Sequence, residues 1–84
     1  DVQFHELICE RSGHALLLHT WRGINPLSWT LFTLTILHRD LVEIAERHRP
    51  IVDALRARDP ELAVKAIKDH VLTLGEEVSH DLPA

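Results

Sequence analysis

Apolar residues recur every three or four positions along most of this 84-residue chain, which is the spacing of one face of an α-helix. No stretch alternates apolar and polar residues as a half-buried strand does, and the sequence contains no internal repeat or low-complexity tract. The pattern therefore predicts an all-α fold, an antiparallel helical bundle whose helices are separated by short breaks.

Glycine, proline and capping residues mark where these helices should begin and end. The expected helices run from residue 1 to about 11, from about 14 to 22, from 26 to about 38, from 41 onward with an interruption near Pro50, and from 60 to about 75. The signals are Ser12-Gly13, Asn25-Pro26, Asp40 with Glu43 as a capping box, Asp59-Pro60-Glu61, and Gly75.

Length, charge and cysteine content exclude several classes of protein. Eighty-four residues allow one domain, and a core of this size often needs a metal or a partner for stability. The formal net charge of −4 argues against nucleic-acid binding by this segment. Cys9 is the single cysteine, so no intrachain disulfide forms, and we expect a small buried thiol. The longest uncharged stretch, residues 23–37, contains Asn25 and Pro26 and is shorter than the ~20 residues that span a bilayer.

Three histidines occupy positions where the helical pattern places core residues. His48 lies within the apolar series of residues 41–55, and His70 lies within that of residues 63–74. His5 shares a helical face with Asp1, four residues earlier. These side chains should point inward, where an unpartnered polar group is costly.

The spacing also places the histidines at similar depths in the bundle. Arg58-Asp59-Pro60 predicts a tight turn between antiparallel helices, with His48 ten residues before Arg58 and His70 ten residues after Pro60. At about 1.5 Å rise per residue both lie roughly 15 Å from the turn. His5, eight residues before Gly13, lies roughly 12 Å from its own turn.

Convergent imidazoles and a carboxylate favour a site for a divalent metal. The alternative is that His48 and His70 are core histidines, each satisfied by a backbone carbonyl or a buried water. His19, His38 and His80 lack this pattern and are predicted at the surface. Helical phase points Arg47 and Arg49 away from the His48 face, which predicts a surface position for both.

Several short motifs resemble one family of helical domains. Asp1-Val2-Gln3-Phe4-His5 is similar to the Asp-x-x-Phe-His motif of the FCD ligand-binding domain, the C-terminal effector module of FadR-type GntR transcription regulators. Ser12-Gly13-His14 resembles its Ser-Gly-Asn turn, with histidine in place of asparagine. The remaining similar positions are Glu46-Arg47-His48-Arg49-Pro50-Ile51, Ala54-Leu55, Asp59, Ala63 and His70-Val71. The resemblance runs from residue 1 to about 72, and it departs from the family pattern where Arg47 separates Glu46 from His48.

The resemblance implies a helical bundle with a central metal, zinc or nickel in many members, held here by Asp1, His5, His48 and His70. These are the residues that the helical-face argument selects. It further implies a small carboxylate effector, a homodimer, and DNA binding through a separate N-terminal winged helix-turn-helix domain. Residues 1–84 are then expected to be the C-terminal part of an FCD-like effector-binding domain in a bacterial cytoplasmic regulator, without enzymatic activity and without a membrane partner.

Two other functions remain open from the sequence. A metal can simply staple a dimerising helical module. A small metallohydrolase could use metal-bound water, although no spare inward-facing carboxylate is evident as a general base. Residues 29–37 are apolar on more than one face, which predicts burial in the bundle interior or in a subunit interface.

Overall fold

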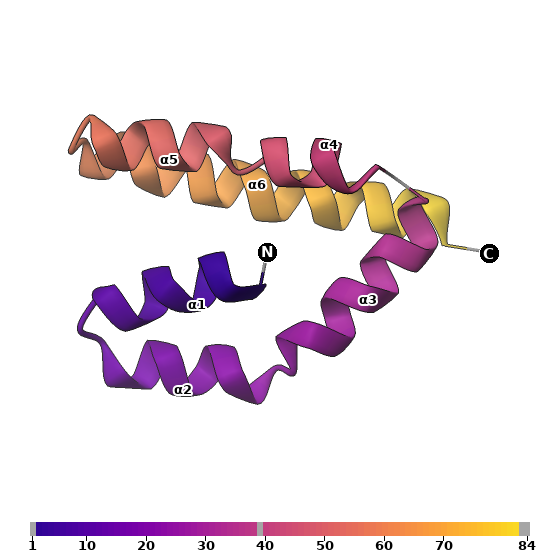
Figure 1. Cartoon of the computed structure of the whole chain (residues 1–84), viewed down its shortest axis with the longest axis horizontal. Coiled ribbons are helices and arrows are strands. Elements are labelled where there is room, and N and C mark those ends of the chain that lie inside the picture. Colours follow the sequence, from indigo (N-terminus) through magenta and orange to yellow (C-terminus); the bar gives the residue numbers. More distant parts are fainter. Residues whose placement is uncertain (1, 39, 83–84) are drawn as a thin grey trace. The chain divides into compact units, whose positions relative to one another are not determined.

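The computed structural model describes residues 2–38 and 40–82, and within them every regular element is an α-helix (Figure 1). The helices are α1 Val2–Arg11, α2 Ala15–Gly23, α3 Pro26–Leu37, α4 Leu41–Glu46, α5 Arg49–Arg56 and α6 Pro60–Asp81. The all-α prediction is confirmed. The chain divides into two compact units, Asp1–Thr35 and Ile36–Ala84. None of the described helices is both long and apolar enough to cross a membrane.

The first unit contains the antiparallel pair α1 and α2, joined by the predicted turn. Gly13 adopts a left-handed backbone with φ of 71°, a conformation that side-chain-bearing residues rarely take. The Ser12 hydroxyl donates to the Cys9 carbonyl at 2.6 Å, which closes the end of α1. His14 is the N-cap of α2, since its Nδ1 accepts the Leu17 N–H at 3.1 Å. The turn therefore forms as predicted, with an imidazole in the capping role.

The start of α3 follows a different capping geometry from the predicted one. Pro26 is the first residue of the helix, as expected, but Asn25 has a left-handed φ of 62° instead of the extended backbone of an N-cap. Large apolar side chains of α3 are exposed, and Trp29 packs edge-on against Phe32 with ring centroids 5.9 Å apart. Within this chain, α3 thus carries an exposed apolar surface.

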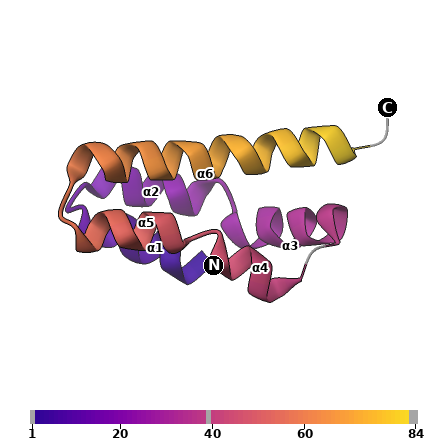
Figure 2. The same ribbon diagram turned by 90° about the horizontal axis from the view of Figure 1, so that it is seen from above.

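The second unit is built on the antiparallel pair α5 and α6, which run alongside each other in both views (Figures 1 and 2). Asp40 caps α4 by accepting the Val42 N–H at 2.9 Å, and Asp59 caps α6 by accepting the Leu62 N–H at 3.1 Å. Pro50 lies in the first turn of α5, so the interruption expected there is a new helix start. Asp40 and Asp59 are thus confirmed as N-caps, although the Asp40 carboxylate accepts from Val42 where the predicted capping box would use the N–H of Glu43.

Helix α6 is longer than predicted. It continues through Gly75 to Asp81, although a fading at Gly75 was expected. A glycine inside a helix costs only about 1 kcal/mol relative to alanine. Two good helix formers, Glu76 and Glu77, follow it, and Glu77 forms an ion pair with Arg47, which offsets part of that cost. The apolar core beneath α6 is small: Ile51 is 2% exposed and Ala54 is fully buried.

Candidate metal centre

His48 and His70 face each other inside the second unit. His48 lies in the break between α4 and α5 and is 7% exposed, while His70 lies near the middle of α6. Their ring centroids are 4.5 Å apart with an interplanar angle of 53°. The sequence-based prediction that these two rings lie at the same depth is therefore confirmed.

The hydrogen bonds of His48 determine which of its nitrogens can act as a ligand. Nδ1 lies 3.1 Å from the Ile44 carbonyl oxygen and 3.2 Å from the Ala45 carbonyl oxygen. Carbonyl oxygens only accept, so Nδ1 carries the proton and donates, and the lone pair of the neutral ring is on Nε2. These acceptors exist because α4 ends at Glu46, which leaves its last carbonyls without the usual helical donors. Metal-bound histidines commonly have this arrangement.

Arg47 is less exposed than the predicted surface position implies. Its side chain is 20% exposed and makes a bidentate ion pair with Glu77 of α6, at 2.5 Å from Nη1 and 3.1 Å from Nη2. Nη2 also lies 3.3 Å from Glu43. The hydrogen bond to Glu77 raises the pKa of the Arg47 guanidinium. Helical phase did not predict this pairing: Arg47 keeps the helical register of α4, with its N–H donating to the Glu43 carbonyl, but its long side chain reaches Glu77 on α6.

The neighbouring arginine behaves as predicted. Arg49 is 64% exposed and pairs with Glu46 on the surface at 2.8 Å. His19, His38 and His80 are exposed, which confirms their predicted surface positions. Nothing in the sequence separated Arg47 from Arg49, because the signal that distinguishes them is the partner at position 77, 30 residues away.

In the first unit, His5 is half-buried on α1. Its ring centroid lies 5.4 Å from that of Trp21 on α2, at an interplanar angle of 34°. Burial lowers the pKa of His5 below its ordinary value, which favours the neutral form that metal binding requires. The Trp21 Nε1 is buried and has no hydrogen-bond acceptor among residues 2–38 and 40–82. Asp1, the fourth predicted ligand, lies outside the described residues.

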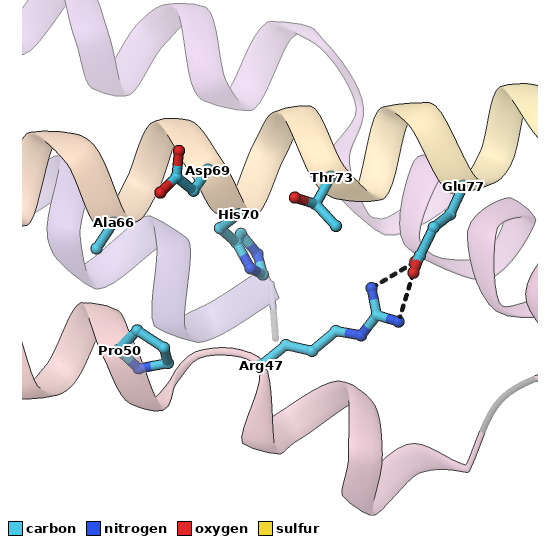
Figure 3. Close-up of a pocket in the computed structure, with 7 residues that line it drawn as sticks. All are labelled: Arg47, Pro50, Ala66, Asp69, His70, Thr73 and Glu77. Atoms are coloured by element: carbon cyan, nitrogen blue, oxygen red, sulfur yellow. Dashed lines mark hydrogen bonds and ion pairs between the residues drawn. The ribbon is translucent and has the colours of Figure 1, made fainter.

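A hollow of about 410 Å³ opens beside His70 in the second unit (Figure 3). Its polar lining comes from Arg47, Asp69, His70, Thr73 and Glu77. The volume is within the range of small-molecule sites. The lining offers carboxylate, hydroxyl and guanidinium groups next to an imidazole that belongs to the histidine pair.

The donor chemistry of the second unit fits a borderline divalent ion. Two imidazoles in van der Waals contact, one with its proton held on Nδ1, suit zinc or nickel better than magnesium or calcium, which prefer oxygen ligands. Two imidazoles do not complete a coordination shell, so further ligands are required.

Comparisons with known proteins agree with the sequence motifs. Residues 1–73 match the FCD domain. A protein of Paenarthrobacter nicotinovorans named "Probable D-xylose utilization operon transcriptional repressor" is 36% identical over 80 residues. The aligned region covers 95% of this chain and 35% of that relative, so the chain spans about a third of the relative's length. No solved structure matches the chain.

Proposed function

The chain belongs to the FCD domain family, and from this premise we propose that residues 1–84 are the C-terminal part of the effector-binding and oligomerisation module of a GntR/FadR-type regulator. The module would form a homodimer and bind a small carboxylate metabolite. A separate N-terminal domain would bind DNA. The naming of a relative as a transcriptional repressor supports a regulatory role over an enzymatic one.

We further propose that Asp1, His5, His48 and His70 hold one divalent ion, zinc or nickel. The observation that carries this proposal is the His48–His70 pair, with centroids 4.5 Å apart and the His48 proton held on Nδ1. The half-buried, neutral-favouring environment of His5 is consistent with a third imidazole ligand. Three neutral imidazoles and one carboxylate would leave the centre with a net positive charge, which favours an anionic effector.

When bound, the ion would supply a positively charged anchor for the carboxylate group of the effector. The chain's own residues would do the rest of the recognition. The hollow beside His70 is large enough for a small metabolite, and Thr73 and Arg47 on its wall can donate hydrogen bonds to oxygens. An effector would change DNA binding only if it favours one of two arrangements of the dimer.

A structural metal staple is the second candidate, and the small core favours it. The buried apolar residues described are Cys9, Ile51 and Ala54. A core of this size gives little stability by itself, so a metal could serve mainly to hold the helices together. Under this alternative a carboxylate would add nothing to the stability of the metal-loaded chain.

Elemental analysis tests the metal site directly. The chain is purified without a histidine tag, nickel resin or chelator, and the metal content per chain is measured for the wild type, His48→Ala and His80→Ala. We expect about one equivalent in the wild type and in the exposed-site control, and loss of the ion in His48→Ala. Stoichiometric metal in His48→Ala would refute the site assignment. A thermal shift of the zinc-loaded chain on adding succinate or malate separates the sensor from the staple.

A further inference from the structure

We propose that Arg47 is a positioning residue whose ion pair with Glu77 fixes the break carrying His48 against the face of α6 carrying His70. This inference rests on the proposed metal site, because fixing the two imidazoles matters most if they bind one ion. Arg47 itself would not touch the metal and would act on it only through the position of His48. Its partner on α6 lies 30 positions further along the chain.

The break between α4 and α5 needs an external support. Arg47 and His48 lie between the last residue of α4, Glu46, and the first residue of α5, Arg49. The backbone N–H of Arg47 donates to the Glu43 carbonyl and that of His48 to the Ala45 carbonyl, both closing the end of α4. Residues at a junction of two short helices lack the continuous hydrogen bonding that makes a helix interior stiff. The His48 ring is bonded to the Ile44 and Ala45 carbonyls at the end of α4, so its position against α6 depends on side-chain contacts that cross from the break to α6.

Two such contacts join the break to α6, and they lie two helical turns apart. His48 meets His70, and Arg47 meets Glu77, seven residues further along α6. Seven residues correspond to about 10.5 Å along a helix and return to nearly the same face. In Figure 3 the Arg47 side chain extends along α6 and ends at Glu77. Two attachments separated along one face oppose both sliding and rotation of the break, which a single contact would not.

The Arg47–Glu77 pair differs from two exposed ion pairs among the described residues of the second unit. Its side chains are 20% and 27% exposed and its geometry is bidentate, whereas Arg49–Glu46 is 64% and 55% exposed. Lys65–Asp69 is also exposed and joins residues one turn apart. Exposed ion pairs between residues close in sequence contribute little to the stability of a fold. A half-buried fork-to-carboxylate pair between separate helices, extended by Glu43, holds a defined geometry.

Metal affinity should report this positioning. Ligands must be held within about 0.5 Å of a productive geometry, and losing a supporting residue typically weakens metal affinity 10- to 100-fold. We therefore expect Glu77→Gln, which removes the negative charge at nearly constant volume, to weaken zinc binding at least tenfold. Arg47→Lys keeps the positive charge but cannot form the bidentate pair, and it should also weaken zinc binding. Glu46→Gln, which breaks the exposed pair, is the matched control and should change affinity less than twofold.

The experiment combines two measurements on the intact chain. Zinc affinity is measured by competition with a chromophoric chelator, and the ring resonances of His48 and His70 are followed by NMR in the metal-free protein. We expect both rings to shift in Glu77→Gln and Arg47→Lys and to stay unchanged in Glu46→Gln. Unchanged ring resonances in both Glu77→Gln and Arg47→Lys, or a zinc affinity of both variants within twofold of wild type, would overturn the inference. If wild type takes up no zinc, the proposed function fails, and the metal-free resonances still decide whether Arg47 positions the rings.

Discussion

At the residue scale, Trp21 offers a direct probe of the proposed ligand His5. The two rings lie 5.4 Å apart, whereas the other tryptophan, Trp29, is 60% exposed and packs against Phe32. In a Trp29→Phe variant, Trp21 is the remaining tryptophan. A paramagnetic ion bound by His5 should quench its emission strongly, because quenching requires close approach.

We therefore expect cobalt to quench the fluorescence of the Trp29→Phe variant with a saturable, one-equivalent titration. The same titration of a variant that also carries His5→Gln should show only weak, non-saturable quenching. Quenching that saturates equally well without His5 would mean that this histidine is not a ligand.

Cys9 gives a second prediction for a single side chain. Burial first, and the charge of Glu6 second, raise the pKa of its thiol above the ordinary value of 9.0. The reactive thiolate is therefore scarce near neutral pH. Alkylation by iodoacetamide at pH 7.5, followed by intact mass, should be much slower in the folded chain than in urea. Since the unfolded chain loses this proton at lower pH than the folded one, stability should fall as the pH rises above about 9. Equal labelling rates with and without urea would contradict the burial of Cys9.

At the scale of elements, each unit contains an antiparallel helix pair and an arginine that forms ion pairs with carboxylates. In the first unit Arg22 of α2 pairs with Glu6 at 2.9 Å and lies 3.5 Å from Glu10, both on α1. In the second unit Arg47 pairs with Glu77 and Glu43. Trp21, which precedes Arg22, contacts the proposed ligand His5. His48, which follows Arg47, contacts the proposed ligand His70. The pair in the second unit is the less exposed of the two, since Arg47 is 20% exposed and Arg22 is 56% exposed.

The cap of α6 sets where that helix begins and therefore the depth of His70. Asp59→Ala removes the hydrogen bond to the Leu62 N–H and should lower the free energy of unfolding by about 1 kcal/mol. Asp59→Asn keeps an acceptor and should be nearly neutral. Urea unfolding followed by circular dichroism measures both. An alanine variant as stable as wild type would show that the cap contributes nothing to α6.

Local sequence signals were sufficient to predict most of these helices and the His48–His70 half of the candidate site. Caps and turns act over a few residues, so Asp40, Asp59 and Gly13 could be assigned from spacing alone. The facing of His48 and His70 followed from equal distances to one turn. The pairing of Arg47 was missed because its partner Glu77 lies 30 residues away, and no local spacing predicts that contact. The continuation of α6 past Gly75 was missed because tertiary contacts, such as that of Glu77, override a weak local preference.

At the scale of the whole molecule, the proposed ligands come from two compact units. His5 belongs to Asp1–Thr35, and His48 and His70 belong to Ile36–Ala84. A metal that binds ligands from both units, and does not bind the unfolded chain, couples their unfolding. At 100 times its dissociation constant such a ligand adds about 2.7 kcal/mol to stability.

This coupling is measurable because both tryptophans lie in the first unit, whereas circular dichroism reports helices in both. With EDTA we expect the fluorescence and circular dichroism transitions in urea to have different midpoints. With one equivalent of zinc both should move to higher urea and coincide. In His5→Ala the zinc-loaded transitions should remain separate, because only the second unit would bind the ion. Coincident transitions in His5→Ala would show that zinc acts without His5, and the proposed four-residue centre would then be wrong.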